Sequence, residues 1–181
     1  MARLLSALEI PGNKEPTDTF HVTVLYLGDK VPIEQLGKAI IATYSVTSAT
    51  TPFTVRTNRV TAFEPHDDGT PIICPIDSPG LHELREKLTA ALDKAGVEYS
   101  KKFPIFVPHM TLGYSKDPGV YADHAADQDF PTVEWGAAEL VLWGGDEGDD
   151  RLVATFPFSL RIEKKALYRA FVRLAMIESR L

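Results

Sequence analysis

The chain has 181 residues, 44% of them apolar, which is enough for one domain with a hydrophobic core or for a domain built from two lobes. Its formal net charge of −6 argues against indiscriminate binding to long nucleic acid, which needs many lysine and arginine contacts to phosphates. No apolar run is long enough to cross a membrane, the first residues do not resemble a signal peptide, and the single Cys74 can form no internal disulfide. We therefore expect a cytoplasmic protein with no membrane partner and no long duplex DNA partner.

The first part of the chain alternates short apolar segments with one helical segment. Pro32 is a suitable first residue for a helix, which we expect to end near Ser45. Within it, Leu36, Ile40 and Ile41 recur at helical spacing, which predicts one buried face. The other apolar runs are short and bounded by turn residues, as is typical of strands. These expected strands cover 3–10, 20–27, 53–56, 59–63 and 71–76.

The second part contains the clearest helix of the sequence. It is expected from Leu81 to Ala95, where apolar residues recur at helical spacing, and Gly96 is a suitable C-terminal stop. A strand around His109 follows, and then an irregular stretch at 115–131. The remaining expected elements are a hairpin with strands at 138–143 and 152–156, and a basic amphipathic helix at 161–181.

One short pattern occurs twice in this chain. A histidine, one apolar residue and a threonine stand at His21 to Thr23 and again at His109 to Thr111, each time in an apolar segment. Residues two apart in an extended strand lie on the same face, so each histidine is expected beside its threonine. Two such strands facing each other would bring two imidazoles and two hydroxyls into one cleft.

A tyrosine follows each histidine at the same offset. Tyr26 and Tyr114 both stand five positions after their histidine, at positions of opposite strand parity. Strict alternation predicts that both tyrosines point away from the cleft. We therefore expect them in the core, or half-buried with a hydrogen-bonded hydroxyl.

The paired pattern suits phosphodiester chemistry. An unperturbed imidazole titrates near pH ~6.5, so one histidine can be neutral while the other is protonated. The neutral one can remove a proton from an attacking water, and the protonated one can protonate the departing ribose oxygen. Threonine hydroxyls can stabilise the phosphoryl oxygens as charge builds on them. A single His-x-Thr strand is usually structural, but two copies with similar flanks favour a function.

These residues resemble the two-histidine (2H) phosphoesterases, which include the 2′,5′-RNA ligase-like and cyclic phosphodiesterase proteins. The segments 21–28 and 108–112 carry the resemblance, and the order of elements around them extends it over residues 3–158. It implies an α+β fold with two pseudo-symmetric lobes of antiparallel sheet plus helices around a central groove. We therefore expect a 2H phosphoesterase domain at 1–160, with one histidine strand from each lobe, followed by the C-terminal helix at 161–181.

The resemblance also implies an activity and a site. It implies metal-independent hydrolysis of a 2′,3′-cyclic or 2′,5′-type phosphodiester in a small nucleotide, a cyclic oligonucleotide or an RNA end. His21 and His109 would be the catalytic acid/base pair, and Thr23 and Thr111 would bind the phosphate. No metal and no cofactor are expected, and the substrate would bind to a monomer. Which histidine is the acid stays open.

Several alternatives stay open beside this reading. A non-catalytic protein could use the same groove to bind RNA ends or signalling nucleotides, although binding alone does not require two imidazoles. An RNA 2′,5′ ligase would use the same site in the reverse direction. A compact member of this family can also be a viral anti-defence enzyme that hydrolyses cyclic nucleotide signals, but no residue here points to that role.

Outside the paired motifs, aromatic side chains could contact a substrate. Trp143 stands at the end of an expected strand and is the best candidate for stacking on a base, whereas Phe63 and Phe103 are more typical of a core or a groove wall. The remaining candidates are interpreted as ordinary surface or core residues. They are Arg56, Arg59, His66, Cys74, His82, Lys101, Lys102, His124 and the acidic run at 146–150.

Overall fold

The computed structural model describes residues 13–16, 19–67, 69–116, 132–144 and 151–158. The chain divides into two compact units, each built from three stretches. Unit 1 comprises Met1–Val24, Thr54–Leu81 and Pro104–Trp135, and unit 2 comprises Leu25–Phe53, His82–Phe103 and Gly136–Leu181. Both histidines of the paired motif fall in unit 1.

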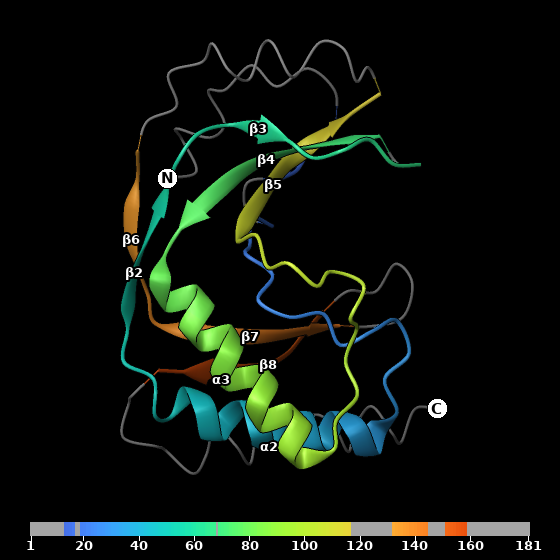
Figure 1. Cartoon of the computed structure of the whole chain (residues 1–181), viewed down its shortest axis with the longest axis vertical. Coiled ribbons are helices and arrows are strands. Elements are labelled where there is room, and N and C mark those ends of the chain that lie inside the picture. The colour runs from blue at the N-terminus through green and yellow to red at the C-terminus, as the bar shows by residue number, and fades with distance from the viewer. Residues whose placement is uncertain (1–12, 17–18, 68, 117–131, 145–150, 159–181) are drawn as a thin grey trace. The chain divides into compact units, whose positions relative to one another are not determined.

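Unit 1 is organised by a six-stranded sheet. The strand order is β1-β5-β4-β2-β6, and β3 pairs with β4 beside this path. Figure 1 shows β3, β4 and β5 adjacent to one another, in antiparallel pairs. The strands are β1 (Asn13–Lys14), β2 (Phe53–Thr57), β3 (Thr61–Ala62), β4 (Thr70–Asp77), β5 (His109–Ser115) and β6 (Glu134–Ala137).

The sequence of β4 explains its central place in this sheet. It is apolar at consecutive rather than alternate positions, and Ile72, Ile73 and Cys74 are each at most 1% exposed. A strand that is buried on both faces has this continuous apolar pattern. Cys74 therefore lies in the core as expected, and burial raises the pKa of its thiol to about 11.

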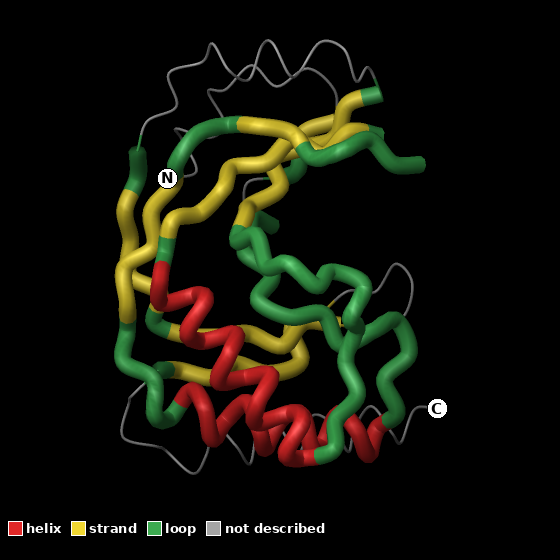
Figure 2. The backbone as a smooth tube through the Cα atoms, viewed as in Figure 1, coloured by secondary structure: helices red, strands yellow, loops and turns green. Residues whose placement is uncertain are grey.

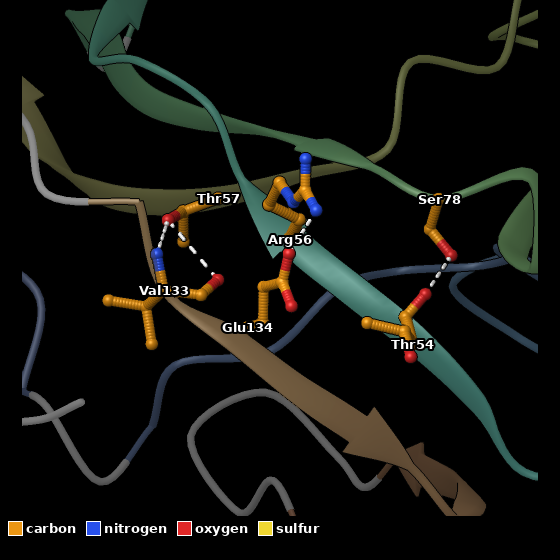
Figure 3. A network of polar contacts seen from close by, with 6 residues as sticks. All are labelled: Thr54, Arg56, Thr57, Ser78, Val133 and Glu134. Atoms are coloured by element: carbon orange, nitrogen blue, oxygen red, sulfur yellow. Dashed lines mark hydrogen bonds and ion pairs between the residues drawn. The ribbon is translucent and has the colours of Figure 1, made fainter.

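Polar contacts attach β2 to its neighbours (Figure 3). The Thr57 hydroxyl accepts a hydrogen bond from the backbone amide of Val133 at 2.7 Å. The Ser78 hydroxyl donates to the carbonyl oxygen of Thr54 at 2.9 Å. Arg56 forms an ion pair with Glu134, but both side chains are about half exposed, so this pair contributes little to stability.

Unit 2 contains a helix packed on a two-stranded ribbon. α2 (Ile33–Thr47) contacts β8 (Arg151–Pro157), which pairs antiparallel with β7 (Glu139–Gly144). The buried centre of this packing is formed by Ile40, Ala154 and Phe156. The partly buried residues around it are Leu36, Tyr44, Leu140 and Leu142.

Most of the second helix, α3 (Pro79–Ala95), also lies in unit 2. Its leucines at positions 81, 84, 88 and 92 are all at most 5% exposed, as the helical spacing predicted. Gly96 ends the helix with a φ of 67°, a left-handed conformation that glycine adopts without steric cost. The amide of Val97 then donates to the carbonyl oxygen of Leu92 at 2.9 Å.

The α+β class, both helices and the 139–157 hairpin are confirmed, while the strand expected at 20–27 and the burial expected of Ile41 are wrong. Residues 20–27 lie outside the sheet, and Ile41 is 53% exposed because the buried face of α2 is centred on Ile40. The expected strand at 3–10 and the helix at 161–181 lie outside the described residues. Within the described part of the chain, no helix is long and apolar enough to cross a membrane.

The neighbouring isoleucines of α2 provide a test of this packing. Ile40→Ala removes a side chain with 0% exposure and should lower the free energy of unfolding by about 2–5 kcal/mol. Ile41→Ala makes the same chemical change at the exposed position and should cost under about 0.5 kcal/mol. Urea unfolding of both variants measures the difference, and equal losses would contradict the assigned face.

Candidate functional site

His109 is the first residue of β5 and is half-buried. Its Nδ1 lies 2.7 Å from the carbonyl oxygen of Val107. A carbonyl oxygen can only accept a hydrogen bond, so Nδ1 carries a proton and donates it. The neutral ring therefore has its lone pair on Nε2, which is the atom left to exchange a proton with a ligand.

His21 is held by the same local contact. Its Nδ1 lies 2.8 Å from the carbonyl oxygen of Thr19, again two residues before the histidine. The same argument places the proton of the neutral ring on Nδ1 and the lone pair on Nε2. Both imidazoles are thus fixed in one tautomer by their own backbone, a feature that the sequence pattern did not reveal.

The segment that carries His21 is irregular rather than a strand. Its apolar run predicted a strand, but a strand needs a partner, and the sheet order leaves this segment outside the sheet (Figure 2). Exposure still alternates locally, since His21 and Thr23 are exposed while Val24 is buried. The pattern therefore predicted the outward side chains correctly and the strand wrongly.

The chain just before His21 is attached to the strand of His109. In the β1–β5 pair, Lys14 lies opposite Gly113. The amide of Glu15 donates to the carbonyl oxygen of Leu112 at 3.0 Å. His21 therefore follows closely on a segment that is hydrogen-bonded to β5, and both histidines belong to unit 1.

A β-bulge at Leu112 sets the direction of the side chains along β5. His109 lies opposite Pro75 and Thr111 opposite Ile73, but the register then shifts. Tyr114 consequently lies opposite Pro71. Positions 71, 73 and 75 of β4 share one face, and directly opposed residues point to the same side of a sheet. His109, Thr111 and Tyr114 therefore share one face of the sheet, which we call the His109 face.

The burial of β5 agrees with this register. Positions 109, 111 and 114 are half-buried, whereas 110, 112, 113 and 115 are buried. Strict alternation predicted Tyr114 on the opposite face, and the extra residue of the bulge overturns that prediction. A glycine inside a strand often marks a bulge, so Gly113 was the available sequence signal.

Strand β3 adds further side chains to the His109 face. Thr61 lies opposite Ile73, which places it on the same face as Thr111 on the other side of β4. Two residues later, the Phe63 ring meets the His109 ring edge-on, with centroids 4.7 Å apart and planes at 83°. Phe63 is therefore part of the wall beside this imidazole, one of the two roles expected for it.

The threonines of the paired motifs have free hydroxyls. Thr111 is half-buried on the His109 face and Thr23 is exposed beside His21. Among the described residues, neither hydroxyl has a hydrogen-bond partner. Both oxygens are therefore available to a ligand.

Tyr26 differs from the expectation that it lies in the core. It is 40% exposed, and its hydroxyl donates to the carboxylate of Asp29. This hydrogen bond, together with burial and the negative charge of Asp29, raises the pKa of the phenol. The prediction of a hydrogen-bonded hydroxyl is confirmed, whereas the prediction of a buried or half-buried ring is wrong.

Trp143 belongs to the other unit. It lies in β7 with 59% of its surface exposed, so its ring can stack on a ligand. Phe103 is 61% exposed, and the ammonium of Lys102 lies 5.6 Å from the centre of its ring. Lys101 lies in the same way 6.0 Å from the Tyr99 ring, so both lysines of this loop have aromatic neighbours.

The other polar candidates that the structure describes are surface residues. Arg59, His66 and His82 are exposed, in line with the expected surface positions. Across the described residues, no group of three or more His, Cys, Asp or Glu side chains could hold a metal ion. His124 and the acidic run at 146–150 lie outside the part that the structure describes.

Comparisons with known proteins match this architecture. The family model described as the 2'-5' RNA ligase superfamily matches residues 16–149. The solved structure of TT0787 from Thermus thermophilus has a TM-score of 0.64 at 20% identity, covering 88% of this chain and 90% of that chain. E. coli LigT complexed with 3'-AMP has a TM-score of 0.61 at 16% identity, covering 88% and 94%. A structure described as a phosphoesterase gives 0.60 at 18% identity, again covering 88% and 94%. Curated proteins yield no match. At these identities the solved structures establish a shared fold.

Gly113 tests the contact between β1 and β5. A Cβ at this position would lie 2.4 Å from the carbonyl oxygen of Asn13, so Gly113→Ala must displace β1. We expect a loss of about 1–3 kcal/mol in the free energy of unfolding and faster hydrogen exchange at the Glu15 amide. Gly136→Ala is the matched control, because nothing lies within 4 Å of its added methyl group. Unchanged exchange at Glu15 in Gly113→Ala would contradict the assigned pairing.

Proposed function

The chain belongs to the 2'-5' RNA ligase superfamily, and on that basis we propose that it is a metal-independent phosphoesterase. Its substrate would be a cyclic or 2′,5′-type phosphodiester in a small nucleotide, a cyclic oligonucleotide or an RNA end. The observation that carries the proposal is the matched pair of histidines. Each donates from Nδ1 to a backbone carbonyl two residues earlier and leaves Nε2 for a ligand.

The two imidazoles would act in opposite protonation states. The neutral histidine accepts a proton at Nε2 from a water molecule as the water oxygen forms a bond to phosphorus. The protonated histidine donates its Nε2 proton to the ribose oxygen as the phosphorus–oxygen bond to that oxygen breaks. Neither ring needs to turn, because the Nδ1–H hydrogen bond to the backbone persists in both states.

The phosphate itself would be bound by hydroxyl groups. Thr23 and Thr111 each stand two residues after a motif histidine, and neither hydroxyl has a partner in the described residues. In the transition state they can donate to the phosphoryl oxygens as negative charge builds there. The exposed ring of Trp143, which belongs to unit 2, is a candidate surface for stacking on a base.

A nucleotide substrate agrees with the ligands of a similar fold. E. coli LigT has been crystallised with 3'-AMP, with ATP and with NADP+. All three contain an adenosine with at least one phosphate. A small ligand of this kind also suits a chain with a net charge of −6, because a few local contacts can bind it.

Substitution of either motif histidine tests the mechanism. His21→Ala and His109→Ala should each lower kcat by about 10²–10⁴-fold, because each removes one half of the acid/base pair. Turnover of a panel of 2′,3′-cyclic nucleotides and 2′,5′-linked oligonucleotides, followed by mass spectrometry, gives the measurement. His82→Ala, at an exposed position on α3, is the matched control and should keep full activity.

The panel also separates this proposal from its alternatives. Full turnover in either motif variant would refute the paired mechanism. Tight nucleotide binding by the wild-type protein without any change in product mass would indicate the non-catalytic binder. Joined products at high oligonucleotide concentration would indicate the ligase direction.

Treatment with a chelator tests whether the reaction requires a metal ion. Turnover should be unchanged after incubation with excess EDTA and dialysis, because the proposed proton transfers use imidazole and hydroxyl groups alone. Measurement of kcat before and after treatment, in metal-free buffer, is sufficient. Loss of activity that returns on adding Mg²⁺, Mn²⁺ or Zn²⁺ would show that a metal ion is required.

A further inference from the structure

We infer that Tyr114 is a specificity-determining residue, whose ring binds the nucleobase of the nucleoside attached to the scissile phosphate. This inference rests on the proposed function. It follows from the bulge at Leu112, which turns Tyr114 onto the His109 face.

The position of Tyr114 fits the size of a nucleoside. Its partner Pro71 lies two residues from Ile73, the partner of Thr111, so Tyr114 stands about 6–7 Å beyond Thr111 along the sheet. Ile73 in turn lies two residues from Pro75, the partner of His109. A phosphate bound near His109 and Thr111 would therefore have its ribose and base directed along this row toward Tyr114.

The surroundings of Tyr114 favour an aromatic ligand. Its ring is half-buried, while positions 113 and 115 on either side are buried. The exposed His66 ring meets it at 68°, with centroids 6.1 Å apart. Asn13 of β1 lies directly opposite on the neighbouring strand. A partly exposed aromatic ring with polar groups at its border is a suitable surface for stacking a base.

A comparison of substrates with and without a base distinguishes a base-binding role of Tyr114 from a structural one. A contact to the base affects only substrates that carry a base, whereas a structural residue affects every substrate. Adenosine 2′,3′-cyclic phosphate and glycerol 1,2-cyclic phosphate share the five-membered cyclic phosphate, but only the first has a base. The ratio of their KM values is therefore the informative quantity.

The experiment compares three substitutions. Tyr114→Leu keeps an apolar side chain without an aromatic ring and should raise KM for the adenosine substrate about tenfold, with kcat within about twofold. The same variant should leave KM for the glycerol substrate unchanged. Tyr114→Phe keeps the ring and should match the wild type on both. Tyr99→Leu is the control, since Tyr99 follows α3 and its hydroxyl is hydrogen-bonded to Asp93 of that helix at 3.4 Å.

The outcomes distinguish a failure of the inference about Tyr114 from a failure of the proposed function. An equal change on both substrates in Tyr114→Leu, or no change on the adenosine substrate, would overturn the role of Tyr114 while leaving the function intact. If the wild type hydrolyses neither substrate, small five-membered cyclic phosphates are not its substrates, and calorimetric binding of 3′-AMP takes over as the measurement. Binding about tenfold weaker in Tyr114→Leu would then support the inference, and absence of binding by the wild type would overturn it.

Discussion

The pairing of β4 with β5 decides which side chains share a surface with His109. β4 is buried on both faces and fixes the sheet, while β5 follows it in register as far as Thr111. One extra residue, Leu112, then shifts the register and reverses the direction of every later side chain. The same stretch of β5 binds β1, through the Glu15 amide and the close approach permitted by Gly113. The bulge at Leu112 thus decides which side chains belong to the His109 face. It also lies next to the pairing of β1 with β5, and β1 is followed by the segment that carries His21.

The second organising feature is the hydrogen bond from each motif histidine to its own backbone. Each motif histidine is oriented by the carbonyl oxygen two residues before it rather than by a carboxylate. Such a contact fixes the tautomer and the ring plane without adding a negative charge beside the imidazole. Each ring can then serve as acid or base according to its protonation state, as the proposed mechanism requires.

Sequence periodicity was sufficient to predict the elements that are stabilised by contacts between residues close together in the sequence. Both helices and the hairpin followed from spacing and end signals, and the leucine face of α3 was correct. The paired His-x-Thr pattern also selected residues whose side chains are at least partly exposed. Strict alternation gave the wrong face for Tyr114, because a bulge depends on the pairing of two strands. In the sequence of β5 alone, Gly113 is its one indication. The strand expected around His21 failed for a related reason, since an apolar run does not reveal whether a neighbouring strand exists to pair with it.

The most direct test is nitrogen–proton NMR of the imidazole rings, with and without a nucleoside 3′-monophosphate. In the free protein, the neutral rings of His21 and His109 should both carry their proton on Nδ1, because both donate to backbone carbonyls. On addition of the nucleotide, the Nε2 signals of both should shift together, while those of His82 on α3 should not. A proton on Nε2 in either neutral ring, or a ligand-induced shift in only one of the two, would contradict the account of a paired acid and base.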